Sequence, residues 1–200
     1  NKRIIEKQDF LDAVDRIIGG LEKKNKIIKP REKKTIAYHE AGHASVSWLL
    51  EHANPLVKVT IVPRGQALGA AWYLPEERQI TTKAQLLDQM VSLLGGRAAE
   101  ELVFGEVSTG ALNDLERVTK QAYAMVVYYG LDKEIGNLSF YDSSGQSEYG
   151  FQKPFSEKTA EKIDAQIRTM VEEAYEKAKS LLKDNREKLD ALAQILVERE

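Results

Sequence analysis

A five-residue run, His39-Glu40-Ala41-Gly42-His43, fits the pattern H-E-x-x-H. Residues four apart are neighbours on one face of a helix, so both imidazoles can bind one metal ion at about 2.0–2.1 Å. Glu40 lies one position, or about 100°, further around the helix, which favours a contact with metal-bound water over direct ligation. A metal lowers the pKa of its bound water towards about 7, so the carboxylate can take the proton and leave hydroxide to attack a carbonyl group.

The two histidines also lie on the apolar stripe of the helix that is expected to carry them. Counting in steps of three and four from Ile36 gives His39, His43, Val46 and Leu50, the positions that normally face a core. A single histidine there is more often a hydrogen-bonded core residue than a ligand, because its nitrogen atoms need a partner. Here, however, two of the three histidines of the chain stand at the metal-binding spacing. We therefore predict a zinc site.

A catalytic zinc site requires a third protein ligand and an open position. The extended pattern H-E-x-x-H-x-x-G-x-x-H fails, because Val46 and Leu49 occupy the positions of its glycine and last histidine. The chain has no cysteine, so the third ligand should be a carboxylate. Glu100 or Glu101 could supply it, unless they belong to a solvated helix face, and so could Asp114, unless it caps a helix. Spacing alone leaves these alternatives open.

The elements around the motif predict a mainly helical domain with a small sheet. Pro30 starts a helix and Asn54-Pro55 follows its end. Leu56–Pro63 alternates and is rich in β-branched residues, and Ala67–Pro75 follows after an Arg64-Gly65 turn, so the two segments should form a hairpin. Helices are expected at residues 4–21, 30–53, 81–105 (broken or bent at Gly95-Gly96), 113–130, 156–182 and after 185, with a loop over 131–154.

Composition limits the classes of function. The 200 residues are 42% hydrophobic, enough for one compact domain. The net charge is −2, without the basic excess of a nucleic-acid-binding protein, so no nucleic-acid partner is expected. There is no signal peptide and no apolar run of about 20 residues, so we expect the chain as given to be soluble. Because it starts at Asn1 rather than at methionine, we expect it to be a fragment of a longer protein.

Five motifs in this order resemble a known family: "HEAGHA", "TIVPRG", "LGGRAAEEL", "STGALNDLERVT" and "YYGL". They look like the peptidase domain of FtsH-type, membrane-anchored AAA+ zinc proteases, which include bacterial FtsH and the mitochondrial AAA proteases. The resemblance extends from about Lys34 to the C-terminus. It implies a peptidase domain over residues 29–200, with C-terminal helices over 155–200. Residues 1–28 resemble the end of the ATPase lid and a linker.

The resemblance also implies roles for individual residues. His39 and His43 would bind one Zn²⁺ per chain, with Asp114 as the third ligand, and Glu40 would be the general base. Glu100 and Glu101 remain the second choice for that ligand. The segment "GQALGAAWYLP" would border the cleft. Its edge strand, with Gly69, Ala70 and Ala71, would pair with an extended polypeptide substrate through main-chain hydrogen bonds, which tolerate many sequences.

For the longer protein, the resemblance implies an ATP-dependent protease that degrades membrane and cytosolic proteins as a homo-hexameric ring. It would be anchored in the bacterial inner membrane with this domain facing the cytoplasm, or alternatively in the mitochondrial inner membrane. The chain contains no G-x-x-x-x-G-K-[ST] loop, so ATP would bind only to the longer parent. We expect this fragment alone to cleave only unstructured polypeptides.

Two other functions are compatible with the same residues. A non-catalytic helical assembly module would use the apolar helix faces for subunit contacts, with a structural metal or none. A zinc hydrolase of another class, such as an amidase acting on small molecules, would use the same motif. The expected edge strand beside the motif argues against the amidase, because such a strand serves to bind extended peptides.

Overall fold

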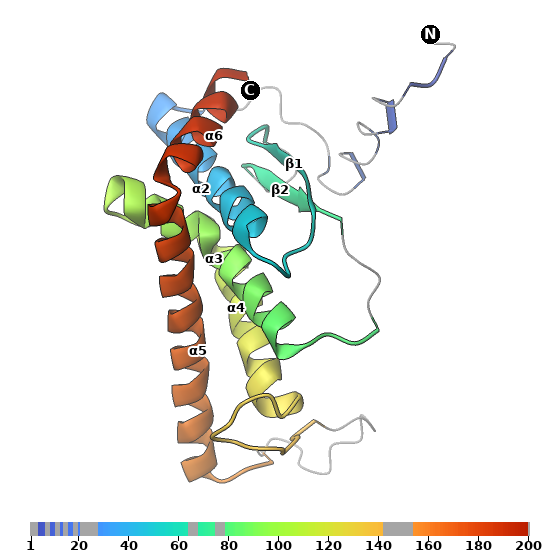
Figure 1. Cartoon of the computed structure of the whole chain (residues 1–200), viewed down its shortest axis with the longest axis vertical. Coiled ribbons are helices and arrows are strands. Elements are labelled where there is room, and N and C mark those ends of the chain that lie inside the picture. Colours follow the sequence, from blue (N-terminus) through green and yellow to red (C-terminus); the bar gives the residue numbers. More distant parts are fainter. Residues whose placement is uncertain are drawn as a thin grey trace.

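Five helices and one two-stranded sheet make up the part of the chain that the structure describes (Figure 1). The structure is a computed structural model, and it describes residues 28–63, 68–74, 79–141 and 154–199, with isolated positions between 4 and 20. The expected helix over residues 4–21 and the Arg64-Gly65 turn therefore lie largely outside the described residues. The elements are α2 (Pro30–Leu49), β1 (Leu56–Thr60), β2 (Ala70–Tyr73), α3 (Lys83–Phe104), α4 (Leu112–Tyr123), α5 (Glu157–Asp184) and α6 (Arg186–Arg199).

Helix α2 carries the H-E-x-x-H motif and begins where the sequence predicts, with Pro30 in its first turn. A proline fits there because its missing N–H would have no partner within the helix. The helix ends at Leu49, four residues before the expected end, because Leu50 turns to an extended conformation (φ −94°, ψ 139°). The backbone N–H of His52 then donates to the carboxylate of Asp88 on α3 at 3.3 Å, which fixes the turn that leads into the sheet.

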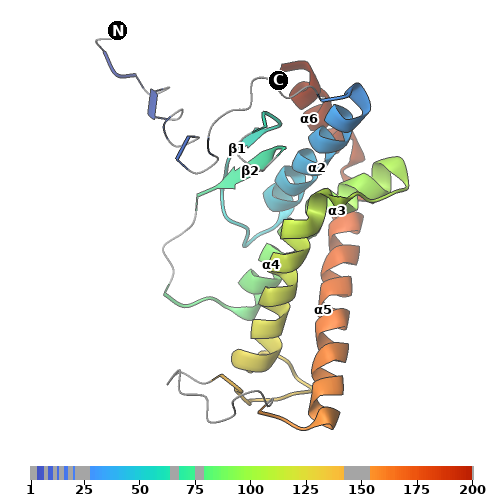
Figure 2. The ribbon, with the colours of Figure 1, turned by 180° about the vertical axis from the view of Figure 1, so that it is seen from behind.

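The predicted hairpin is confirmed as an antiparallel pair of short strands. Thr60 of β1 lies opposite Ala70 of β2, and Leu56 lies opposite Tyr73, with an irregularity between Leu56 and Lys58. Both views of the ribbon show the two strands beside α2 (Figures 1 and 2). The sheet therefore forms a wall next to the helix that carries the motif.

Helix α3 is continuous, so of the two alternatives predicted at Gly95-Gly96, a break or a bend, the break is wrong. The two glycines let α3 pass very close to α2 instead of ending a helix. A Cβ atom at Gly42 would lie 2.3 Å from the carbonyl oxygen of Gly95 and 2.6 Å from the Cβ of Ala99, and one at Gly95 would lie 2.7 Å from the carbonyl oxygen of Gly42. No side chain fits at either position.

Helix α4 begins with a 3₁₀ turn, Thr109–Ala111, that leads directly into Leu112. The sequence predicts a helix from Asn113 to Gly130, and the structure divides this stretch in two. Its last part, Ala124–Tyr128, is a π-helical turn. Asp114 lies in the first turn of α4 and is not its N-cap. A carboxylate is favoured there, because the N-terminus of a helix carries a partial positive charge.

The long helix α5 packs along α3 and α4, and α6 packs against α2 (Figure 2). The predicted fold class, mainly helical with a small sheet, is confirmed. Within the described residues, no helix combines the length and apolar character that crossing a membrane requires. The hydrophobic core lies between these helices and includes Val46, Met90, Leu94, Val118, Met125, Ile163, Ala178, Leu182 and Leu189.

The close contact between the two helices predicts that a glycine-to-alanine substitution, which usually stabilises a helix, destabilises this protein. Replacing glycine by alanine inside a helix normally stabilises it by roughly 0.5–1 kcal/mol. We expect Gly42→Ala to destabilise the protein by about 3 kcal/mol or more, because the new methyl group meets backbone atoms that cannot move aside. This corresponds to a melting temperature lower by roughly 6–12 °C. Ser180→Ala, on the exposed face of α5, is the control, and equal melting temperatures for the two variants would contradict the expectation.

Candidate metal centre

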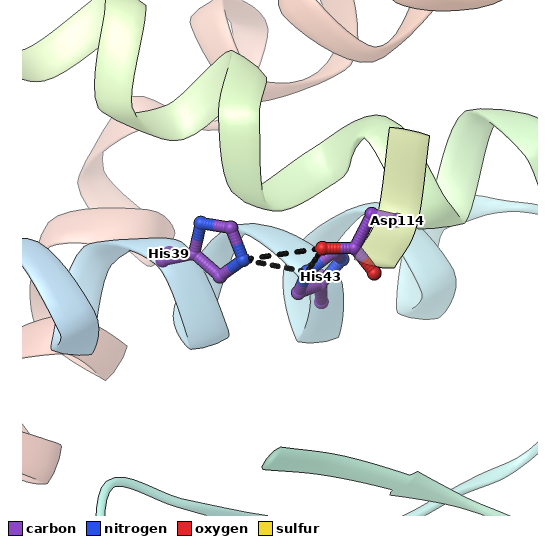
Figure 3. A group of neighbouring side chains, drawn as sticks. All are labelled: His39, His43 and Asp114. Carbon is purple, nitrogen blue, oxygen red and sulfur yellow. Dashed lines mark hydrogen bonds and ion pairs between the residues drawn. The ribbon is translucent and has the colours of Figure 1, made fainter. Parts of the chain in front are cut away.

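Two histidines from α2 and one aspartate from α4 point towards one another (Figure 3). The Nε2 atoms of His39 and His43 are 3.1 Å apart. One carboxylate oxygen of Asp114, Oδ2, lies 3.4 Å from each of them. Two ligand atoms from adjacent turns of α2 and one from the distant helix α4 thus form a nearly equilateral triangle.

This triangle has the dimensions of one face of a tetrahedral zinc site. Ligand atoms at about 2.0–2.1 Å from a tetrahedral zinc ion lie about 3.3 Å from one another. The observed separations of 3.1 Å and 3.4 Å agree with that value. Two imidazole nitrogens and one carboxylate oxygen are also a donor set that zinc accepts, with a fourth position left open. The residues present therefore fit a catalytic zinc ion.

The other ring nitrogen of each histidine is held by a hydrogen-bond acceptor. The Nδ1 atom of His39 lies 2.7 Å from Oε1 of Glu100, and Nδ1 of His43 lies 3.0 Å from the carbonyl oxygen of Ser92. A carboxylate and a carbonyl oxygen can only accept a hydrogen bond, so both Nδ1 atoms donate. In the neutral form that metal ligation requires, each ring then has its lone pair on Nε2, which faces the other members of the triangle.

Glu100, one of the alternative ligands considered above, occupies a different position. It contacts Nδ1 of His39, and its second oxygen accepts a hydrogen bond from the backbone N–H of Ser108 at 2.6 Å. It therefore links α2 to the 3₁₀ turn that precedes Asp114. Glu101 points the other way, where it accepts a hydrogen bond from Tyr175 and lies 3.7 Å from Lys179.

Gly96 is a member of the site that the sequence analysis missed. A Cβ atom there would lie 2.6 Å from Nε2 of His39 and 2.6 Å from Nε2 of His43. The absent side chain leaves the space that a metal ligand set needs. Glu100 follows Gly96 by four residues on α3 and therefore lies on the same helix face. That spacing is the signal by which a partner of the histidines could have been found.

Glu40 lies beside the triangle and against the start of β2. A Cβ atom at Gly69 would lie 2.7 Å from Cγ and 2.8 Å from Oε1 of Glu40, so only a glycine lets the strand approach the carboxylate this closely. A cleft of about 1140 Å³ contains both histidines, Glu40 and Asp114 in its walls. Gly69, Ala70 and Ala71, the residues expected to bind substrate, line the same cleft.

The buried charges of the site shift one another's pKa values. Burial alone would lower the pKa of His39, but hydrogen bonds to Asp114 and Glu100 outweigh it and raise the pKa to about 10. The pKa of Asp114 falls well below its usual range, because the two histidines overcome the effect of burial. Burial raises the pKa of Glu40, against the opposing charges of His43 and His39. Asp114 is therefore the carboxylate of the triangle that stays negatively charged beside the two rings.

Comparison with known proteins shows which family the chain is similar to. The sequence profile of peptidase family M41 matches residues 26–200. The chain is 64% identical over 199 residues to the ATP-dependent zinc metalloprotease FtsH of Parabacteroides distasonis, covering 100% of this chain and 29% of that protein. It is 47% identical over 196 residues to the mitochondrial inner membrane m-AAA protease component AFG3L2 of Mus musculus, covering 98% of this chain and 24% of that protein.

A third relative, the ATP-dependent zinc metalloprotease FtsH of Karelsulcia muelleri, is 54% identical over 200 residues and is covered to 32% of its length. The chain thus spans about a quarter to a third of the length of these curated relatives. The similarity includes the whole cleft, because all of its wall residues lie between residues 29 and 117.

Zinc stoichiometry tests which carboxylate completes the ligand set. We expect about one zinc ion per chain in the unmutated protein, measured by elemental analysis after gel filtration. Asp114→Asn should lose most of this zinc, because its neutral side chain is a poor ligand. Glu101→Gln is the matched control and should retain it, since Glu101 faces α5. Loss of zinc in Glu101→Gln alone would contradict the assignment.

The space at Gly96 gives a second test of the same group. We expect Gly96→Ala to weaken zinc binding by about tenfold or more, because its methyl group would meet both Nε2 atoms. The helical circular dichroism should persist, since alanine favours helices. Titration with a fluorescent zinc chelator measures the affinity. Arg97→Ala, one residue further along α3 and beside Tyr175, serves as the control, and equal affinities in the two variants would argue against this geometry.

Proposed function

The chain belongs to peptidase family M41, and from this premise we propose that it is a zinc-dependent endopeptidase domain that hydrolyses peptide bonds in its 1140 Å³ cleft. The observation that carries the proposal is the triangle of His39, His43 and Asp114 with Glu40 beside it. Three metal ligands and an adjacent carboxylate at one cleft are the combination that metal-assisted hydrolysis requires.

In this proposal, His39, His43 and Asp114 hold the zinc ion. When bound, zinc supplies Lewis acidity, which lowers the pKa of a coordinated water and polarises the carbonyl group of the substrate. Glu100 and the carbonyl group of Ser92 keep the histidine rings in the orientation that ligation needs, through their hydrogen bonds to the two Nδ1 atoms.

Glu40 acts as the general base. Its side chain is buried on α2 and lies against Gly69. A polypeptide bound in the cleft shields it further from bulk water. One carboxylate oxygen accepts the proton of the attacking water. The same group then carries that proton to the nitrogen atom of the departing amine, which completes hydrolysis without a second acid.

The substrate lies along β2 in an extended conformation. Within the described residues, β2 is paired with β1 and with no other strand, and Gly69, Ala70 and Ala71 line the cleft. Small side chains at this edge leave room for a second chain, and main-chain hydrogen bonds bind it without strict sequence requirements. This arrangement favours polypeptides over the small amides of the alternative hydrolase.

We further propose that the chain is the proteolytic part of a longer, ATP-dependent protein, with residues 1–28 as the end of the ATPase lid and 29–200 as the peptidase domain. The printed names of two relatives, ATP-dependent zinc metalloproteases, support this assignment. The parent would form a homo-hexameric ring anchored in the bacterial inner membrane, or in the mitochondrial inner membrane. It would degrade membrane and cytosolic proteins that the ATPase unfolds.

Substitution of Glu40 tests the proposed function. We expect Glu40→Gln to lower kcat on an unstructured, internally quenched peptide by about 100-fold or more, because an amide cannot accept the proton. Its zinc content should not change. Glu51→Gln, which removes an exposed carboxylate just beyond α2, is the control and should keep its activity. Full activity of Glu40→Gln would favour the non-catalytic assembly module.

A further inference from the structure

Strand β2 contacts helix α2 at both of its ends, on either side of the metal ligand His43. At its beginning, Gly69 lies against Glu40. At its end, the hydroxyl group of Tyr73 lies 3.0 Å from the hydroxyl group of Ser47, a buried residue on α2. The first contact is steric and has little direction. The second is a hydrogen bond and therefore fixes the distance and orientation of the strand end relative to the helix.

The hydroxyl group of Ser47 is the centre of a small cluster of hydrogen-bonded groups. It lies 2.7 Å from the carbonyl oxygen of His43 and also contacts the hydroxyl group of Ser92 on α3. A serine hydroxyl has one proton to donate and two lone pairs to accept. The Ser47 hydroxyl is the donor towards both the His43 carbonyl oxygen and the Tyr73 hydroxyl oxygen, so its one proton is shared between them, and it accepts from Ser92.

The cluster joins three elements at the turn of α2 that carries His43. Ser92 takes part twice, since its hydroxyl group contacts Ser47 and its carbonyl oxygen accepts the hydrogen bond from Nδ1 of His43. Tyr73 brings β2 into this arrangement, and it also lines the cleft. The end of β2 is therefore held by Ser47 and Ser92, two residues that also contact His43.

From this geometry we propose that Tyr73 is a positioning residue, whose hydroxyl group holds β2 at the distance from Glu40 and the metal ligands at which a strand-bound peptide bond can react. This inference rests on the proposed function. Without the hydrogen bond, the peptide still pairs with the main chain of β2, so its binding is unchanged. The strand end is freer to shift, and the scissile bond is less often in the reactive position.

The test compares Tyr73→Phe with the unmutated chain on the quenched peptide, with zinc content measured for both. Phenylalanine keeps the ring and removes only the hydroxyl group. We expect kcat to fall about three- to tenfold, the equivalent of one net hydrogen bond, while KM stays within about twofold and zinc content is unchanged. Ser47→Ala should produce a similar fall in kcat, and the double variant should be little worse than either single variant.

Tyr175→Phe is the matched control. It also removes a tyrosine hydroxyl that hydrogen-bonds a neighbouring element, here Glu101, but it lies outside the cleft walls. Its kcat should equal that of the unmutated chain. An unchanged kcat in Tyr73→Phe, an effect on KM alone, a loss of zinc, or an equal fall in Tyr175→Phe would each overturn this inference and leave the proposed function intact. Full activity of Glu40→Gln in the same assay would overturn both.

Discussion

The close crossing of α2 and α3 is the constraint on which the rest of the structure depends. At Gly42 and Gly95 the two backbones approach so closely that a single methyl group does not fit. This approach brings Gly96 opposite both histidines and brings Glu100, one turn later, within hydrogen-bonding distance of His39. A wider crossing would leave the rings without their partners. The positions of the site residues therefore depend on the close packing of the two helix backbones.

The second constraint is the satisfaction of buried polar groups. His39, Glu40, His43 and Glu100 are all buried, and burying such groups without partners is costly. Glu100 reduces this cost by accepting two hydrogen bonds, one from His39 on α2 and one from the backbone N–H of Ser108 before α4. The hydrogen bonds of His39 to Glu100 and of His43 to the carbonyl oxygen of Ser92 also direct both Nε2 atoms towards Asp114. The hydrogen bonds that satisfy these buried polar groups thus also arrange the proposed metal ligands.

Local patterns predicted the elements well, and long-range contacts account for what they missed. The helix with His39 and His43 and the β1–β2 hairpin follow from spacing within a few residues, and the structure contains both. The glycines at 95–96 suggested a break or a bend, and their role in the close packing could not be seen locally, because it depends on a second helix about 50 residues earlier in the chain. The choice between Asp114 and Glu100 was equally open from spacing, since it depends on which atom of His39 each carboxylate meets.

Helix α2 has a distinct partner on each side of the motif, which explains why so short a segment can organise a cleft. His39 and His43 face α3 and the start of α4, whereas Glu40, about 100° around the helix, faces the start of β2. One turn beyond His43, Ser47 meets the end of the same strand. Glu40 and the two histidines are therefore fixed relative to one another by the helix itself. Strand β2 is not part of this helix, so its position relative to α2 is set by separate contacts. That position determines which substrates fit in the cleft.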